Sequence, residues 1–168
     1  AHKYALLHTV LNTAVEEELI DVNPCRIRAA SVIRRAKRIE PASLDELSRL
    51  VAELPDRYRV LALTAAWCAL RFGEATELRR GDVDLEAGLV RVRRGVTWMT
   101  GAPVVDTPKT SAGIRDVHIP PHLLPAVERH LADRTGSGDD ALVFTGDDGG
   151  RLSPHRFRWQ MRRAAAVA

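Results

Sequence analysis

The stretch Val60–Glu74 reads VLALTAAWCALRFGE, and it decides the fold. From Val60 to Leu70 it is nearly all apolar, which predicts a helix that is buried on most sides. Arg71 places a charge directly at the end of this run, and Gly73 predicts a break before a short helix around 74–78. A charged group beside a buried helix is costly unless a partner binds it. Arg71 is therefore the first candidate functional residue.

The residues before this stretch predict further helices. Ser43 with Glu46 three residues later forms a capping box, which begins an amphipathic helix, and Pro55 begins the helix with the apolar run. Apolar residues at three- and four-residue spacing predict an earlier helix over 3–20, ended by the turn signal at 21–24.

The residues after this stretch change to a period of two, which is typical of half-buried strands. The alternation covers 89–93, 103–105 and 114–119 and predicts a three-stranded antiparallel meander. The remaining predicted elements are a helix around 123–131, an extended piece at 141–144, a tight turn at 146–150 and a last helix capped by Ser153.

Composition limits the class of protein. The chain has 168 residues, of which 45% are hydrophobic and 28% charged, as expected for one domain or one domain with a short appendage. The apolar run is too short to span a bilayer. No basic stretch followed by an apolar segment opens the chain, so we expect no secretory leader. Two cysteines, Cys25 and Cys68, are too few for a disulfide framework or a zinc site, so we expect a cytoplasmic protein.

Basic residues are concentrated in two places, although the net charge is only +3. One cluster lies within residues 26–38, a stretch that contains no acidic residue. It consists of Arg26, Arg28, Arg34, Arg35, Lys37 and Arg38. The second consists of Arg151, His155, Arg156, Arg158, Arg162 and Arg163. Neither cluster has a large apolar face beside it, which favours nucleic acid over a membrane. A solvated charge run is the alternative for the first cluster.

Three motifs stand in a characteristic order: Ala69–Glu74, then Thr107–Thr110 with Arg115 in the strand that follows, then Gly149–Ser153. In that order they resemble the catalytic domain of tyrosine recombinases, the phage-integrase family. The resemblance implies a mainly helical α+β fold, with a three-stranded antiparallel sheet packed on helices and one helix of the core-binding domain before it. It assigns 1–24 to that helix, 25–42 to a basic interdomain linker and 43–168 to a partial catalytic domain.

The resemblance also implies roles for single residues. Arg71 would bind the scissile phosphate and stabilise the charge that develops on it, and Glu74 would hold Arg71 in place. Lys109 would protonate the leaving 5′-oxygen. Arg115 is either a phosphate clamp or a solvated strand residue. The alternatives are an Arg71 that merely pairs with Glu74 and a Lys109 that is a solvated turn residue.

The family's His-x-x-Arg box and tyrosine nucleophile have no match. Tyr4 and Tyr58 both precede Arg71, whereas the family's nucleophile comes last, and Tyr58 is better explained by packing. His155 and Arg158 have the box spacing without its context, so Arg158 is expected to be a surface or DNA-facing residue. We therefore expect a recombinase truncated before the box, which is inactive alone.

The resemblance implies a cytoplasmic, nucleoid-associated protein that is encoded by a bacterium or a phage. The parent would recombine duplex DNA as a tetramer through a 3′-phosphotyrosine, with no cofactor because arginines replace a metal. The free fragment is expected to be monomeric. One alternative is a non-catalytic DNA-binding protein derived from this fold. Another is a metal-dependent nuclease that uses Asp82, Asp84 or Asp106 with Lys109.

Core packing is expected for Trp67, which lies inside the apolar run.

Overall fold

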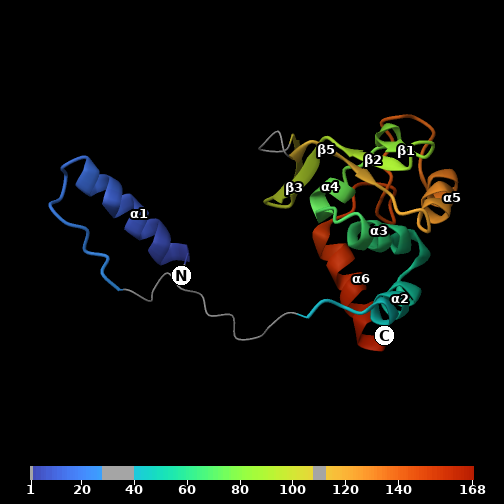
Figure 1. Cartoon of the computed structure of the whole chain (residues 1–168), viewed down its shortest axis with the longest axis horizontal. Coiled ribbons are helices and arrows are strands. Elements are labelled where there is room, and N and C mark those ends of the chain that lie inside the picture. The colour runs from blue at the N-terminus through green and yellow to red at the C-terminus, as the bar shows by residue number, and fades with distance from the viewer. Residues whose placement is uncertain (1, 28–39, 108–112) are drawn as a thin grey trace. The chain divides into compact units, whose positions relative to one another are not determined.

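The computed structural model describes residues 2–27, 40–107 and 113–168. The chain divides into two compact units, Ala1–Pro41 and Ala42–Ala168, each of which is described by itself (Figure 1).

The first unit is one helix with an extended segment along it. Helix α1 spans His2–Glu16, so the predicted helix over 3–20 extends too far. It ends in a Schellman arrangement, in which Leu19 N–H donates to Ala14 O (2.8 Å) and Glu18 N–H donates to Val15 O (3.0 Å). Glu18 takes a left-handed conformation there, with φ of 56°. Glutamate is not a residue type that usually ends helices, so the sequence does not predict this helix end.

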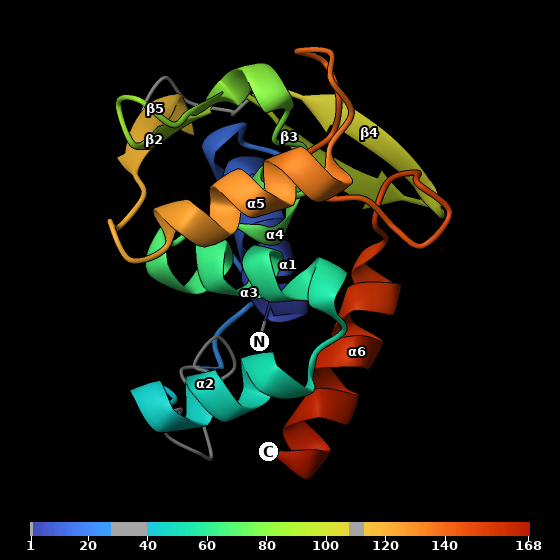
Figure 2. The same ribbon diagram turned by 90° about the vertical axis from the view of Figure 1, so that its right-hand side faces the viewer.

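The helices of the second unit begin where their caps predict. Helix α2 spans Leu44–Glu53, and Ser43 and Glu46 form both hydrogen bonds of the capping box. Helix α6 spans Pro154–Val167, and the Ser153 hydroxyl accepts a hydrogen bond from Arg156 N–H (3.3 Å). Helix α2 packs across the C-terminal part of α6 (Figure 2). The other helices are α3 (Asp56–Trp67), the one-turn α4 (Phe72–Ala75), the 3₁₀ turn η1 (Arg80–Asp82) and α5 (Leu124–Arg134).

Two small sheets replace the single predicted meander. The antiparallel strands β1 (Val83–Asp84), β2 (Leu89–Val92) and β5 (Arg115–His118) form one sheet in the order β1-β2-β5. Strands β3 (Gly95–Met99) and β4 (Ala102–Asp106) form a separate antiparallel ribbon. The prediction that 103–105 join the other two strands was wrong. The tight turn at Thr100 and Gly101, both with positive φ, pairs β4 directly with β3 instead.

The main core lies between α3, the three-stranded sheet, α5 and the segment that leads into α6. Its best-buried members are Tyr58, Leu61, Ala75, Val90, Val92, Leu123, Val143 and Leu152. A smaller cluster of Leu54, Ala62 and Ala164 joins α2, α3 and α6. The loop that follows α3 packs against this core through Leu70. Among the described residues, no helix is long and apolar enough to cross a membrane.

The end of α3 differs from the prediction. The helix stops at Trp67 and is not buried to its end, because the Trp67 side chain is 41% exposed. Its ring packs edge-on against the His122 ring, with centroids 4.7 Å apart, so the expectation of core packing was wrong. The extended piece predicted at 141–144 forms a single bridge, between Leu142 and Arg79.

Candidate functional site

The loop between α3 and α4 places Arg71 at the surface. Cys68 ends α3, Ala69 takes a left-handed conformation with φ of 50°, and Leu70 returns to the core at 5% exposure. Arg71 is then the N-cap residue of α4, and its side chain is 79% exposed. The backbone therefore reverses at Ala69, and the guanidinium that follows the buried helix faces solvent.

Gly73 fixes the position of α4 against strand β3. A Cβ atom built on Gly73 would lie 2.3 Å from the carbonyl oxygen of Val96, a distance that real side chains do not reach. Only glycine lets the two backbones approach this closely. The short helix α4 and its Glu74 are therefore held at a set distance from the ribbon.

The Glu74 carboxylate accepts four hydrogen bonds. Its Oε1 accepts from Arg71 Nη1 (2.9 Å) and Arg115 Nη1 (3.2 Å). Its Oε2 accepts from the backbone N–H of Arg71 (2.9 Å) and from Arg115 Nη2 (2.9 Å). Glu74 is only 7% exposed. Two arginines thus share one buried carboxylate, and the cluster keeps a formal charge of +1.

Electrostatics keep Glu74 ionised. Burial alone would raise the pKa of this carboxyl group, but the hydrogen bonds from the Arg115 guanidinium and from the Arg71 N–H and guanidinium outweigh it and lower the pKa to about 2. The same interaction raises the pKa of Arg115. Both partners are therefore charged at any pH near neutrality.

The cluster is suited to bind an anion. Arg71 uses one of its five side-chain N–H donors on Glu74, and the rest of its guanidinium is exposed. An exposed guanidinium held by a buried carboxylate can bind a phosphate oxygen without first losing conformational freedom. Arg115 is joined to this pair from strand β5, a contact between residues 41 positions apart that local sequence spacing does not predict.

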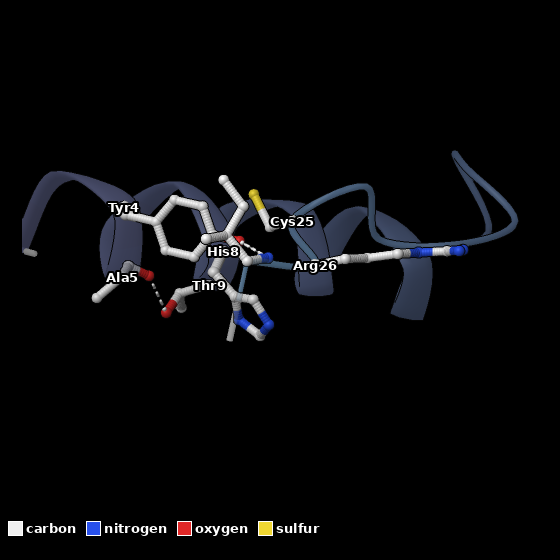
Figure 3. Close-up of a pocket in the computed structure, with 7 residues that line it drawn as sticks. Tyr4, Ala5, His8, Thr9, Cys25 and Arg26 are labelled. Carbon is white, nitrogen blue, oxygen red and sulfur yellow. Dashed lines mark hydrogen bonds between the residues drawn. The ribbon is translucent and has the colours of Figure 1, made fainter. Parts of the chain in front are cut away.

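Several predicted site residues lie outside the described part of the chain. They are Lys109, Arg28, Arg34, Arg35, Lys37 and Arg38. Arg26 lies in the first unit, where it is exposed and helps to line a groove of about 380 Å³ beside α1. In Figure 3 its side chain extends away from Tyr4 and His8, which line the same groove.

Helix α6 presents basic side chains to solvent. Arg158 and His155 are exposed, and the Arg163 guanidinium lies 4.8 Å from the centre of the Trp159 ring. Among the described residues, no carboxylate oxygen lies within 4.0 Å of Arg158, whereas Arg156 pairs with Asp147 (3.3 Å). Arg158 is therefore a free cation on this helix within the part of the chain that is described.

Arg151, from the same basic cluster, has a structural partner that sequence reasoning missed. Glu77 is fully buried, and both of its oxygens accept hydrogen bonds from the Arg151 guanidinium. Arg79 Nη2 donates to the same carboxylate at 3.1 Å and Arg79 Nη1 donates to Asp140 at 2.7 Å. The sequence signal for this partner is the acidic residue Glu77, which stands between Ala75 and Leu78, both of them buried. Arg151 is therefore used to fix the turn before α6.

Tyr58 is not presented as a nucleophile. Tyr58 is 1% exposed, its hydroxyl donates to Asp147 Oδ1 (3.0 Å), and burial together with this hydrogen bond raises its pKa. The packing role predicted for Tyr58 is confirmed. In the first unit, the Tyr4 hydroxyl accepts a hydrogen bond from the N–H of Ile27 (2.8 Å).

The acids considered for a nuclease site are used separately. Asp82 pairs with Arg94 (3.0 Å) and Asp84 with Arg91 (2.6 Å). Asp106 accepts a hydrogen bond from the N–H of Thr107 (2.7 Å). Within the described residues, no three His, Cys, Asp or Glu side chains gather as a metal site. The structure therefore does not bring these carboxylates together.

Comparison with curated proteins identifies relatives along almost the whole chain. The prophage phiRv2 integrase of Mycobacterium tuberculosis is 46% identical over 170 residues, which cover 98% of this chain and 45% of that protein. The integrase of Mycobacterium phage L5 is 39% identical over the same shares. The chain thus spans slightly less than half the length of these relatives. No family model matches it.

Solved structures share the fold. A Tn1549 transposon integrase in complex with a circular intermediate DNA superposes with a TM-score of 0.83 over 99% of this chain and 58% of that chain, at 17% identity. A lambda integrase dimer bound to a core site gives 0.64 over 98% and 57%, at 16% identity. The predicted integrase-like α+β fold is thereby confirmed. A XerC-like tyrosine recombinase of Caldanaerobacter subterraneus is 30% identical over 74% of this chain and 36% of that protein. Homology along the sequence and agreement of the fold lead to one conclusion: this chain belongs to the tyrosine recombinase family and is related to its phage integrases.

Proposed function

We propose that this chain is the part of a site-specific tyrosine recombinase that binds duplex DNA and holds the scissile phosphate. The observation that carries the proposal is the exposed Arg71 guanidinium, which the buried Glu74 carboxylate anchors at the end of α3. The homology to phage integrases supports the same reading. Arg71 binds the non-bridging phosphate oxygens and stabilises the charge that develops on them in the transition state.

The reaction of the whole protein is transesterification. A tyrosine hydroxyl attacks the phosphorus, the bond to the 5′-oxygen breaks, and a 3′-phosphotyrosine forms. The leaving 5′-oxygen takes a proton, which the family resemblance assigns to Lys109. Attack by the 5′-hydroxyl of a second strand then releases the tyrosine. The bond energy is kept in the covalent intermediate, so the strand exchange needs no external energy source.

DNA contacts come from both units of the chain. The first basic cluster, Arg26 to Arg38, forms a linker over 25–42 that follows the duplex, and Arg158 contacts DNA from α6. The residues before this linker are the last helix of a core-binding domain, and 43–168 are part of the catalytic domain. The compact unit that begins at Ala42 supports this division. The DNA complexes formed by the Tn1549 and lambda integrases support the proposed DNA contacts.

The chain alone does not cleave DNA. Both of its tyrosines precede Arg71, whereas the family's nucleophile comes last. The Tyr58 hydroxyl is also buried and hydrogen-bonded, which supports an inactive chain. The whole protein works as a tetramer on DNA, whereas the free chain is a monomer. Light scattering that finds a stable tetramer at micromolar concentration would contradict the last statement.

The test is duplex binding with an arginine variant and a matched control. Fluorescence anisotropy with a labelled duplex should give weaker binding for Arg71→Gln than for the unaltered chain. Arg91→Gln, which removes an arginine that is ion-paired on β2, should bind as the unaltered chain does. Equal binding by both variants would remove Arg71 from the phosphate site. A covalent, SDS-resistant adduct with nicked DNA would show that the chain contains its own nucleophile.

A further inference from the structure

We propose that Arg115 is a positioning residue, which clamps the Glu74 carboxylate from strand β5 and thereby directs the Arg71 guanidinium toward the phosphate. This inference rests on the proposed function of Arg71. It gives Arg115 a third role, different from the phosphate clamp and the solvated strand residue that the sequence left open.

The first support is the geometry of the clamp. Arg115 Nη1 and Nη2 donate to different oxygens of Glu74, at 3.2 and 2.9 Å. Arg115 Nη1 also donates to the carbonyl oxygen of Gly113 (3.3 Å). Two parallel hydrogen bonds between a guanidinium and a carboxylate fix the plane of both groups. The carboxylate therefore cannot rotate, and the remaining lone pairs point at Arg71.

The second support is the rigidity of the elements that hold the clamp. Arg115 begins strand β5 opposite Val92, which is 1% exposed in the core. Glu74 lies on α4, which Gly73 seats against the backbone of Val96. The two ends of the clamp are thus fixed independently, 41 positions apart in the sequence. The Arg115 side chain joins α4 to the sheet through the two hydrogen bonds to Glu74.

The third support is the different exposure of the two arginines. The Arg115 side chain is 31% exposed and gives three hydrogen bonds to protein groups. The Arg71 side chain is 79% exposed and gives one. A phosphate clamp needs free donors at the surface, and Arg71 has them. Arg115 acts on the phosphate through Glu74 and Arg71.

Removal of Arg115 has a defined consequence. Glu74 would lose one hydrogen bond on each oxygen and would stay buried, which is costly for an ionised group. Arg71 would then be drawn into neutralising this carboxylate and would be less available for an external anion. A lysine at 115 would keep the charge but could not hold both oxygens, because its ammonium is a single point donor.

The experiment is a double-mutant cycle on duplex binding with Arg71→Gln, Arg115→Gln and the double variant of the whole chain. We expect each single variant to weaken binding by about tenfold, roughly the loss of one charged hydrogen bond. The double variant should be no weaker than Arg71→Gln, because Arg115 acts only through Arg71. Arg91→Gln is the matched control, since its side chain is 32% exposed and also ion-paired.

A second readout does not depend on DNA. Carboxyl NMR titration should give a higher pKa for Glu74 in Arg115→Gln and, to a smaller degree, in Arg115→Lys. If Arg115→Gln does not fold, the cycle is run with Arg115→Lys. If the fold-losses of duplex affinity in the two single variants multiply in the double variant, Arg115 is a direct phosphate ligand. That result would overturn this inference alone. An Arg71→Gln variant that binds DNA normally would overturn the proposed function as well as the inference.

Discussion

Glu74 links the stability of the second unit to pH. Its folded-state pKa of about 2 lies below the ordinary value of 4.5. The ionised carboxylate therefore stabilises the folded state above pH 4.5, and this contribution is lost as the pH falls toward 2. The shift corresponds to about 3 kcal/mol.

Glu74→Gln should lower the free energy of unfolding at pH 7 by about that amount and flatten its dependence on pH between 4.5 and 2. Urea denaturation at pH 7 and pH 3 measures both effects. Glu128→Gln, at an exposed position on α5, is the control and should unfold as the unaltered chain does. A Glu74→Gln variant with unchanged acid sensitivity would mean that Glu74 does not hold the two arginines.

Ala69 is a second residue with a measurable energetic effect. Its φ of 50° is unfavourable for a residue with a Cβ atom and is free of strain for glycine. Ala69→Gly should therefore stabilise the protein by about 0.5–1 kcal/mol. Ala66→Gly, in the last turn of α3, should destabilise it by about 1 kcal/mol. Thermal unfolding compares the two, and a loss of stability in both would contradict the assigned conformation.

The residues of the site could be predicted from sequence only in part. Arg71 and Glu74 are three positions apart, so local spacing was enough to pair them. Arg115 could not be joined to them, because alternation in a strand says which side chains share a face and not what that face contacts. Trp67 was misjudged for a related reason. An apolar run does not reveal where the helix ends, and α3 ends before the core does.

At the scale of elements, the contact between α4 and β3 is the most sensitive to substitution. A methyl group on Gly73 would meet the backbone of Val96, which cannot move as a side chain can. Gly73→Ala should lower the free energy of unfolding by about 2–3 kcal/mol and weaken duplex binding, because Arg71 and Glu74 shift with α4. Gly138→Ala is the control, since nothing lies within 4 Å of its added Cβ atom. Equal stability of the two variants would mean that α4 is not held by this contact.

Element boundaries followed from sequence wherever a polar cap marks them. Ser43 and Ser153 begin their helices at the predicted positions. Helix ends were less predictable, because Glu18 and Ala69 adopt left-handed conformations without being glycine. Strand pairing was predicted least well. Three alternating segments are compatible with several pairings, and only the turn at Thr100 and Gly101 determines which segments meet.

At the scale of the whole molecule, the distribution of charge matters more than its sum. Many arginines of the second unit are bound to carboxylates and add little to the external field. Examples are Arg57, Arg59, Arg79, Arg91, Arg94, Arg115 and Arg151. Arg71 and Arg158 differ, since one is largely exposed and the other is exposed with no carboxylate beside it in the described part of the chain. The net charge of +3 therefore understates the positive potential over particular surfaces.

Duplex binding should accordingly be strong in dilute salt and fall steeply as salt is added, because each phosphate contact releases condensed counterions. Arg158→Gln should weaken binding and make the slope of log affinity against log salt shallower by about 1, since about 0.9 counterions are released per phosphate neutralised. Arg129→Gln removes an exposed arginine from α5 and the same unit of charge. If α6 faces the DNA, this control should leave the slope unchanged, whereas equal changes in both variants would indicate a response to net charge alone. A slope near zero for the unaltered chain would exclude phosphate contacts as the source of its affinity.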